Sequence, residues 1–162
     1  MKAWIHIIFA ILLVACGERP GNNNSERVTY VDGDDPKMNA AIREARKSYP
    51  YFFGRLTAGD TSEYYFGVKL RIPYGDGNGE HMWFNDLYFK GDTLMGILCN
   101  DPVNIATMKK GDTVMIDKSL LSDWEFAKDG KLIGSYTTRV LYNRMTPEEK
   151  KELIEQLGLT IE

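Results

Sequence analysis

Histidine and cysteine are scarce in this chain of 162 residues, which contains two of each: His6 and His81, Cys16 and Cys99. Zinc sites usually take three or four nitrogen and sulfur ligands, so a zinc-dependent activity is disfavoured. The low cysteine content also excludes a disulfide-rich fold, which means that a hydrophobic core must hold the domain together. We therefore expect no metal site and no cofactor.

Blocks of basic residues are also missing from the sequence. The formal net charge is -3, with 20 Lys and Arg against 23 Asp and Glu distributed along the chain. Nucleic acids and anionic lipid surfaces are bound mainly through clustered Lys and Arg side chains. The scattered charges therefore argue against both as the main partner.

No apolar run is long enough to span a membrane, because the longest, residues 3–14, has about a dozen residues where about 20 are needed. The run follows Lys2 and ends at small residues, an order that is typical of a secretion signal. The segment LVAC at 13–16 resembles a bacterial lipobox, which implies cleavage before Cys16 and a diacylglycerol on its sulfur. The alternative is a plain secretory signal with an incidental cysteine. It is the weaker interpretation because the small residues end directly on Cys16.

The lipobox implies a chain in three parts. We expect residues 1–15 to be removed as a signal peptide, residues 16–27 to form a flexible tether, and residues 28–162 to form one domain. A tether of about a dozen residues would reach about 20 Å. We expect the protein to be anchored in a membrane by its lipid and to face the periplasm or the cell exterior. Because Gly17 rather than Asp follows the cysteine, lipoprotein sorting rules imply the outer membrane in a host that has one.

Hydrophobic spacing predicts an α+β domain. A helix is expected over residues 36–49, capped by Asp35 and interrupted at Pro50, and a second over about 147–157, where Thr146 and Glu149 form a capping box. Alternation with period two predicts strands within 28–31, 63–72, 80–89, 91–99, 113–117 and 123–142. The elements show no βαβ alternation. We therefore expect a mostly antiparallel, twisted sheet of about five or six strands, with an N-terminal and a C-terminal helix packed on it.

Several segments together resemble the YegJ-like family of uncharacterised bacterial domains. They cover most of residues 34–141 and are DDPKMNAAIREARKSYPYF, VKLRIPYGDGNGEHMWFNDLYF, MGILCNDPVNIATMKKGDTVMID and LSDWEFAKDGKLIGSYTTRVL. Signatures that fall in the same order include EHMW at 80–83, Gly96, Gly111 and SDW at 122–124. The resemblance implies a bacterial domain whose members are often secreted or lipid-anchored. It brings no established activity.

An enzyme of this sequence would have to use His81, the only histidine that remains after removal of residues 1–15. Glu80 cannot serve as its acid–base partner in one site, because adjacent residues of a strand point to opposite faces. Cys99 could be a nucleophile with His81 as base and Asp86 or Asp123 as the orienting acid. A core position is the better interpretation for Cys99, because free cysteines are among the most buried residues.

The segment SDWEF at 122–126 is the other polar candidate. Asp123 and Trp124, with Arg139 on the predicted partner strand, could form a charge-assisted hydrogen bond under an indole ring. Structural pinning is the first interpretation of this cluster. A recognition surface is the second, and it would require Trp83 or Trp124 to be exposed.

Two functions follow from these features. The first is a lipid-anchored envelope protein whose non-catalytic domain binds a protein or another envelope component. The alternative is an envelope hydrolase that uses His81 with Glu80, Asp123 or Cys99.

Overall fold

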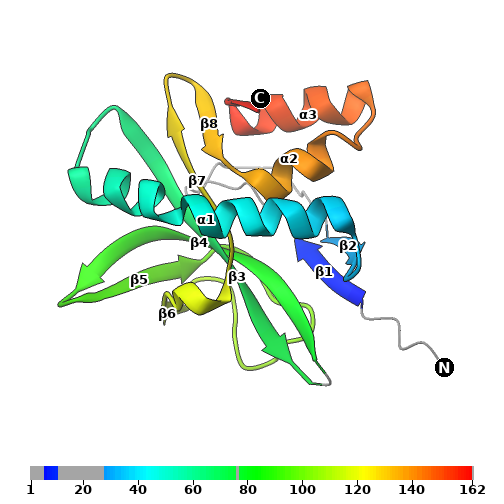
Figure 1. The fold of residues 1–162 in the computed structure, drawn as a ribbon, viewed down its shortest axis with the longest axis horizontal. Helices are drawn as coiled ribbons and strands as arrows, with labels where there is room; N and C mark the ends of the chain where they lie inside the picture. The colour runs from blue at the N-terminus through cyan, green and yellow to red at the C-terminus, as the bar shows by residue number, and fades with distance from the viewer. Residues whose placement is uncertain (1–5, 11–27, 76, 162) are drawn as a thin grey trace.

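The computed structural model describes residues 6–10, 28–75 and 77–161, which form an α+β fold (Figure 1). The helices are α1 (Pro36–Ala58), α2 (Tyr136–Tyr142) and α3 (Pro147–Leu157), with a 3-10 helix η1 (Lys118–Leu120). The strands are β1 (His6–Ala10), β2 (Val28–Asp32), β3 (Glu63–Tyr74), β4 (Asn78–Lys90), β5 (Thr93–Leu98), β6 (Thr113–Met115), β7 (Leu121–Lys128), β8 (Lys131–Gly134) and β9 (Thr160–Ile161). The predicted fold class is confirmed. Cys16 and the predicted tether at 16–27 lie outside the described residues.

The strands form one sheet in the order β2-β1-β4-β3-β7-β8-β9, and β5 and β6 extend it from the far half of β4. The β1–β4 and β8–β9 pairs are parallel and the other pairs are antiparallel. The described sheet has nine strands rather than about five or six, and two of the additional strands are the two-residue β9 and β1, which lies inside the predicted signal peptide. Removal of residues 1–15 stays a prediction. No helix among the described residues is both long and apolar enough to cross a bilayer.

Helix α1 begins where the sequence predicts but does not stop at Pro50. The carboxylate of Asp35 caps its N-terminus by accepting backbone hydrogen bonds from the first turn. Proline removes one backbone hydrogen bond, which favours a break. The helix continues because the next turn places Phe52 in the core, where its ring centroid lies 5.3 Å from that of Trp124. The predicted interruption at Pro50 is therefore wrong, because the packing of this turn outweighs the lost bond.

The second strand of the predicted hairpin, β8, is also shorter than expected. The hairpin turns at Asp129-Gly130 as predicted, but β8 ends at Gly134 and α2 follows directly. Gly134 has φ 80° and lies so close to Trp124 that a Cβ atom would come within 2.4 Å of the indole. The next residue, Ser135, also has positive φ (53°), and the two together turn the chain out of the sheet. Helix α3 confirms its predicted capping box and ends at Gly158.

Strands β3, β4 and β7 form the centre of the sheet and are buried on both faces. The face toward α1 is apolar, with a core of Ala45, Phe52, Val68, Leu70, Met82, Phe84, Trp124 and Phe126. The opposite face carries polar and charged side chains at alternate positions, and these are buried as well: Lys69, His81, Asp123 and Glu125. A sheet with two buried faces explains why period-two alternation did not decide which face is the inner one.

Candidate functional site

A row of buried polar side chains crosses the centre of the sheet. Lys69 on β3 is the cross-strand partner of Trp83 on β4 and of Asp123 on β7. None of the three side chains is more than 1% exposed. Lysine and aspartate are almost never fully buried unless they are paired, so this row is unusual.

The row is held together by Thr137 at the start of α2. The Nζ of Lys69 donates to Thr137 Oγ1 at 3.0 Å, and the same hydroxyl donates to a carboxylate oxygen of Asp123 at 2.5 Å. Nζ also lies 4.6 Å from the ring centroid of Trp83, a cation–π distance. The lysine is therefore connected to the aspartate through one hydroxyl group and to the neighbouring strand through an indole.

Asp123 also caps helix α2 from outside the helix. Its carboxylate accepts from the backbone N–H of Tyr136 at 3.0 Å and of Thr137 at 2.7 Å. The residue at the N-cap position, Ser135, makes no cap hydrogen bond and instead donates its hydroxyl to Glu125 at 2.6 Å. Because an N-terminal carboxylate stabilises a helix, Asp123 explains why α2 forms where the sequence predicted a strand.

Burial shifts the acid–base properties of the row. Desolvation lowers the pKa of Lys69 to about 8, and the opposing effect of the Asp123 charge is smaller. Desolvation raises the pKa of Glu125 to about 8, against the hydrogen bond from Ser135. It also raises the pKa of Asp123, although Lys69 and Thr137 act in the other direction. Glu125 is therefore mostly protonated at neutral pH. Such groups gather at functional sites, but structural networks perturb pKa values too, and the bonds to α2 indicate the structural role here.

Glu80 and His81 point to opposite faces of β4, as predicted from their adjacency. The two oxygens of Glu80 accept from the backbone N–H of Val103 at 2.7 Å and of Asn104 at 3.0 Å, which fixes the loop between β5 and β6. His81 lies on the polar face opposite Arg71, and it is 1% exposed. Desolvation, together with the charge of Lys69, holds the pKa of His81 well below its usual range. The imidazole is therefore neutral at physiological pH.

The remaining predicted site residues are buried or lie elsewhere in the fold. Cys99 is buried at the end of β5, which agrees with the core interpretation. Trp83 and Trp124 are each 1% exposed and Asp123 is fully buried, so the exposure that a recognition surface would require is not found and structural pinning stays the first interpretation. Arg139 lies on α2 rather than on a strand, with its guanidinium 5.7 Å from the ring of Tyr136. Each indole is buried because both faces of the sheet are covered.

The structure instead exposes six other aromatic side chains: Tyr51, Phe53, Tyr64, Tyr65, Tyr88 and Phe89. Phe53 and Phe89 are in contact although they come from different elements, and we call this pair the aromatic surface. Phe53 on α1 and Phe89 on β4 are 39% and 46% exposed, and their rings meet edge to face with centroids 6.1 Å apart. The ends of α1 and β4 and the start of β3 lie at the end of the molecule away from β1 and β2 (Figure 1). The sequence offered one signal: aromatic residues occupy consecutive positions at 64–66 and 88–89, so alternation cannot bury them all.

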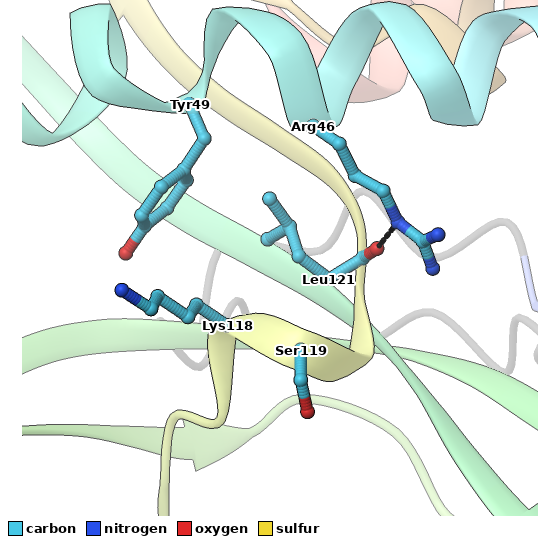
Figure 2. A pocket seen from close by; sticks show the side chains of 5 residues that line it. All are labelled: Arg46, Tyr49, Lys118, Ser119 and Leu121. Atoms are coloured by element: carbon cyan, nitrogen blue, oxygen red, sulfur yellow. Dashed lines mark hydrogen bonds between the residues drawn. The ribbon is translucent and has the colours of Figure 1, made fainter.

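A shallow pocket of about 370 Å³ lies between α1 and η1, lined by Arg46, Tyr49, Lys118, Ser119 and Leu121 (Figure 2). The Nε of Arg46 donates to the backbone carbonyl of Leu121 at 2.7 Å, so this arginine links α1 to the start of β7. The Tyr49 hydroxyl and the Lys118 amine point into the same space. No group of three His, Cys, Asp or Glu side chains in the part of the chain that the structure describes could hold a metal ion.

The chain matches a protein family over residues 35–161, nearly the whole of the domain described above. The family is described as "Uncharacterized protein conserved in bacteria (DUF2314)". The chain belongs to the DUF2314 family. The match begins at the cap of α1 and ends in β9, so the DUF2314 region includes the buried row and the aromatic surface and leaves out β1 and β2.

Two relatives are similar to most of the chain. The YegJ protein of Escherichia coli K12 is 32% identical over 127 residues, which is 77% of this chain and 81% of YegJ. This confirms the resemblance to the YegJ-like family. A Neisseria meningitidis serogroup B protein whose name calls it an ankyrin repeat protein (NMB1133/NMB1171) is 32% identical over 133 residues. The alignment covers 77% of this chain but only 52% of that relative, so the chain spans about half its length. No solved structure matches the chain.

Proposed function

We propose that this protein is a lipid-anchored component of the bacterial envelope whose DUF2314 domain binds a protein or another envelope component without catalysing a reaction. The lipobox at 13–16 supports the anchor, with the domain facing the periplasm or cell exterior, at the outer membrane where the host has one. The observation that carries the binding role is the aromatic surface. It presents two exposed rings in contact, from α1 and β4, whereas the polar side chains considered for catalysis are buried.

The composition of the aromatic surface is that of a protein interface. Aromatic side chains are enriched at interface cores because each buries a large area with few rotatable bonds. Phe53 and Phe89 come from elements far apart in the sequence and contact each other, so the fold presents them as one rigid pair. Large apolar side chains that are grouped and exposed usually mark an interaction site. The partner is therefore expected to offer an apolar surface to these rings.

The hydrolase alternative would need His81 and an acid to converge in an open cleft. Glu80 points away from His81 and is occupied by two backbone N–H groups. Asp123 is on the same face as His81 but accepts its bonds from the start of α2. The buried positions of His81 and Cys99 favour structural roles for both.

Replacing Cys16 with serine tests the anchor. Acyl chains contribute about 0.8 kcal/mol per buried methylene, so loss of the lipidated sulfur is expected to move the protein from the membrane to the soluble fraction. Fractionation of the native host, followed by immunoblotting, measures the shift. Circular dichroism should show the same folded domain in the released protein, because the core clusters that the structure describes are built from residues 38–161. A variant that stays in the membrane would contradict the anchor.

Photo-crosslinking tests the binding role of the aromatic surface. A benzoylphenylalanine placed at Phe89 is expected to give a discrete adduct in cells, and one placed at the exposed Glu155 on α3 is not. Adding Phe53→Ser should reduce the Phe89 adduct by about tenfold, because central aromatic residues of an interface often contribute more than 1 kcal/mol each. Immunoblotting measures the adducts. Equal adducts from both positions, or an adduct that Phe53→Ser leaves unchanged, would contradict the proposal.

A further inference from the structure

The outer edge of β4 at residues 79–82 accepts a strand in the full-length chain. Strand β1 occupies this edge in parallel register, with Ile8 beside Glu80 and Phe9 beside His81. The edge continues into the β5 pairing, where the carbonyl of Trp83 accepts from the N–H of Cys99 at 3.0 Å. Alternate residues of a strand direct their backbone groups to the same edge, so the N–H and C=O of His81 also face it.

Removal of β1 would leave the backbone groups of this edge unpaired. Glu80 and His81 are at most 1% exposed with β1 in place, and backbone groups that lose a hydrogen-bond partner next to such side chains are costly. Strand β2 would lose its partner as well, because β1 is the neighbour that separates it from β4 in the strand order. Cleavage before Cys16 would thus create two complementary open edges in one chain.

The direction and register of β2 already fit the edge of β4. Strand β2 is antiparallel to β1, and β1 is parallel to β4, so β2 runs antiparallel to β4. Ile8 of β1 pairs with Tyr30 of β2 on one side and with Glu80 of β4 on the other. Phe9 pairs in the same way with Thr29 and with His81. No reversal or register shift is needed for β2 and β4 to pair directly.

We propose that β2 moves inward by one strand position when the signal peptide is removed and pairs antiparallel with β4, with Thr29 opposite His81 and Tyr30 opposite Glu80. The proposal rests on the cleavage before Cys16 proposed above. The displacement is one interstrand spacing, about 4.8 Å. As part of the same chain, β2 has a high effective concentration at this edge, which favours it over a strand from a second molecule.

The start of α1 provides a fixed end for this movement. The Asn39 side-chain amide donates to the carbonyl of Gly33 at 2.9 Å, and Arg144 pairs with Asp35 at 2.6 Å. Residues 33 and 34 are the short joint between β2 and these fixed points. Strand β2 can therefore swing inward about Gly33 while α1 keeps its position. Strand β1 then occupies the β4 edge only until processing.

Nuclear magnetic resonance of residues 16–162, with Cys16→Ser to prevent lipidation, tests the strand exchange. This chain retains every residue of the three core clusters. Backbone nuclear Overhauser contacts are expected between Thr29 and His81 and between Tyr30 and Glu80. With β1 in place, two interstrand spacings, about 9.6 Å, separate these residues and exclude such contacts.

A proline variant supplies a second measurement. Thr29→Pro removes the N–H that faces the carbonyl of His81 in the proposed register, so the amide exchange of His81 should become about tenfold faster. Asn23→Pro, placed in the tether outside β2, serves as the control and should leave exchange unchanged.

Three results would overturn the strand exchange. They are fast exchange at 79–82 without contacts to β2, contacts in a different register, and contacts that arise only between molecules in a concentration-dependent dimer. Intact mass measurement of the protein from its native host tests the cleavage separately. A native chain that retains residues 1–15 would contradict the proposed processing, whereas the pairing of β2 in residues 16–162 is decided by the resonance data alone.

Discussion

Asp123→Ala is expected to lower the free energy of unfolding by about 3 to 5 kcal/mol, the range for removing one partner of a buried charged pair. The carboxylate accepts from the backbone N–H groups of Trp124, Tyr136 and Thr137 and from the Thr137 hydroxyl. Alanine would leave these donors unsatisfied and would leave Lys69 buried without its counter-charge. Urea unfolding of residues 16–162, followed by tryptophan fluorescence, measures the loss. Helix α2 should become the least protected helix in hydrogen exchange.

The matched partner of this variant is Lys69→Met, which keeps an unbranched side chain and removes the buried cation. If the row is one network, the double variant should be more stable than the sum of the two single losses indicates, by about 0.5 to 3 kcal/mol. Additive losses, within about 0.5 kcal/mol, would show that the two residues act independently and that Asp123 matters only as the cap of α2.

Trp124→Ala is expected to cost a similar amount, about 3 to 5 kcal/mol, because it leaves a large cavity where α1 meets the sheet. The indole packs on Phe52 and Phe126 with centroids 5.3 and 6.1 Å away, and its Nε1 donates to the carbonyl of Ala45 at 2.9 Å. One side chain therefore joins α1 to β7 by both packing and a hydrogen bond. Thermal unfolding followed by circular dichroism measures the loss.

Phenylalanine substitutions separate the packing from the hydrogen bond. Trp124→Phe keeps a ring but loses the bond to Ala45, which should cost about 1 kcal/mol beyond the packing change. Trp83→Phe is the control, because the Nε1 of Trp83 has no hydrogen-bond partner among the described residues and the ring is equally buried. Equal losses for the two substitutions would show that the Trp124 hydrogen bond contributes nothing measurable to stability.

Local signals in the sequence predicted the parts of the fold that depend on neighbouring residues. The caps at Asp35 and Thr146 and the turn at Asp129-Gly130 are satisfied within a few residues of chain, and all three are confirmed. The opposite directions of Glu80 and His81 follow from strand geometry alone. The structure agrees, since Glu80 instead accepts from the backbone N–H groups of Val103 and Asn104.

The errors all concern contacts between distant residues. Helix α1 passes through Pro50 because Phe52 packs on a tryptophan more than 70 positions away. Helix α2 replaces a predicted strand because the carboxylate that caps it comes from β7. The exposure that a recognition surface would require is not found for the same reason, since a sequence does not show whether the second face of a sheet is covered. The aromatic surface lies at the ends of elements, where periodicity gives no prediction.

By itself, therefore, the sequence determined the lipobox pattern, the α+β class and the helix caps, because each depends on composition or on residues close in the chain. The tertiary structure alone decided that Lys69, Asp123 and Glu125 are buried together, that Phe53 and Phe89 share one exposed surface, and that the edge of β4 accepts a strand. The physical reason is that the burial of a residue and the pairing of a strand depend on the segment that packs against it. That segment comes from a distant part of the chain, which local spacing does not identify.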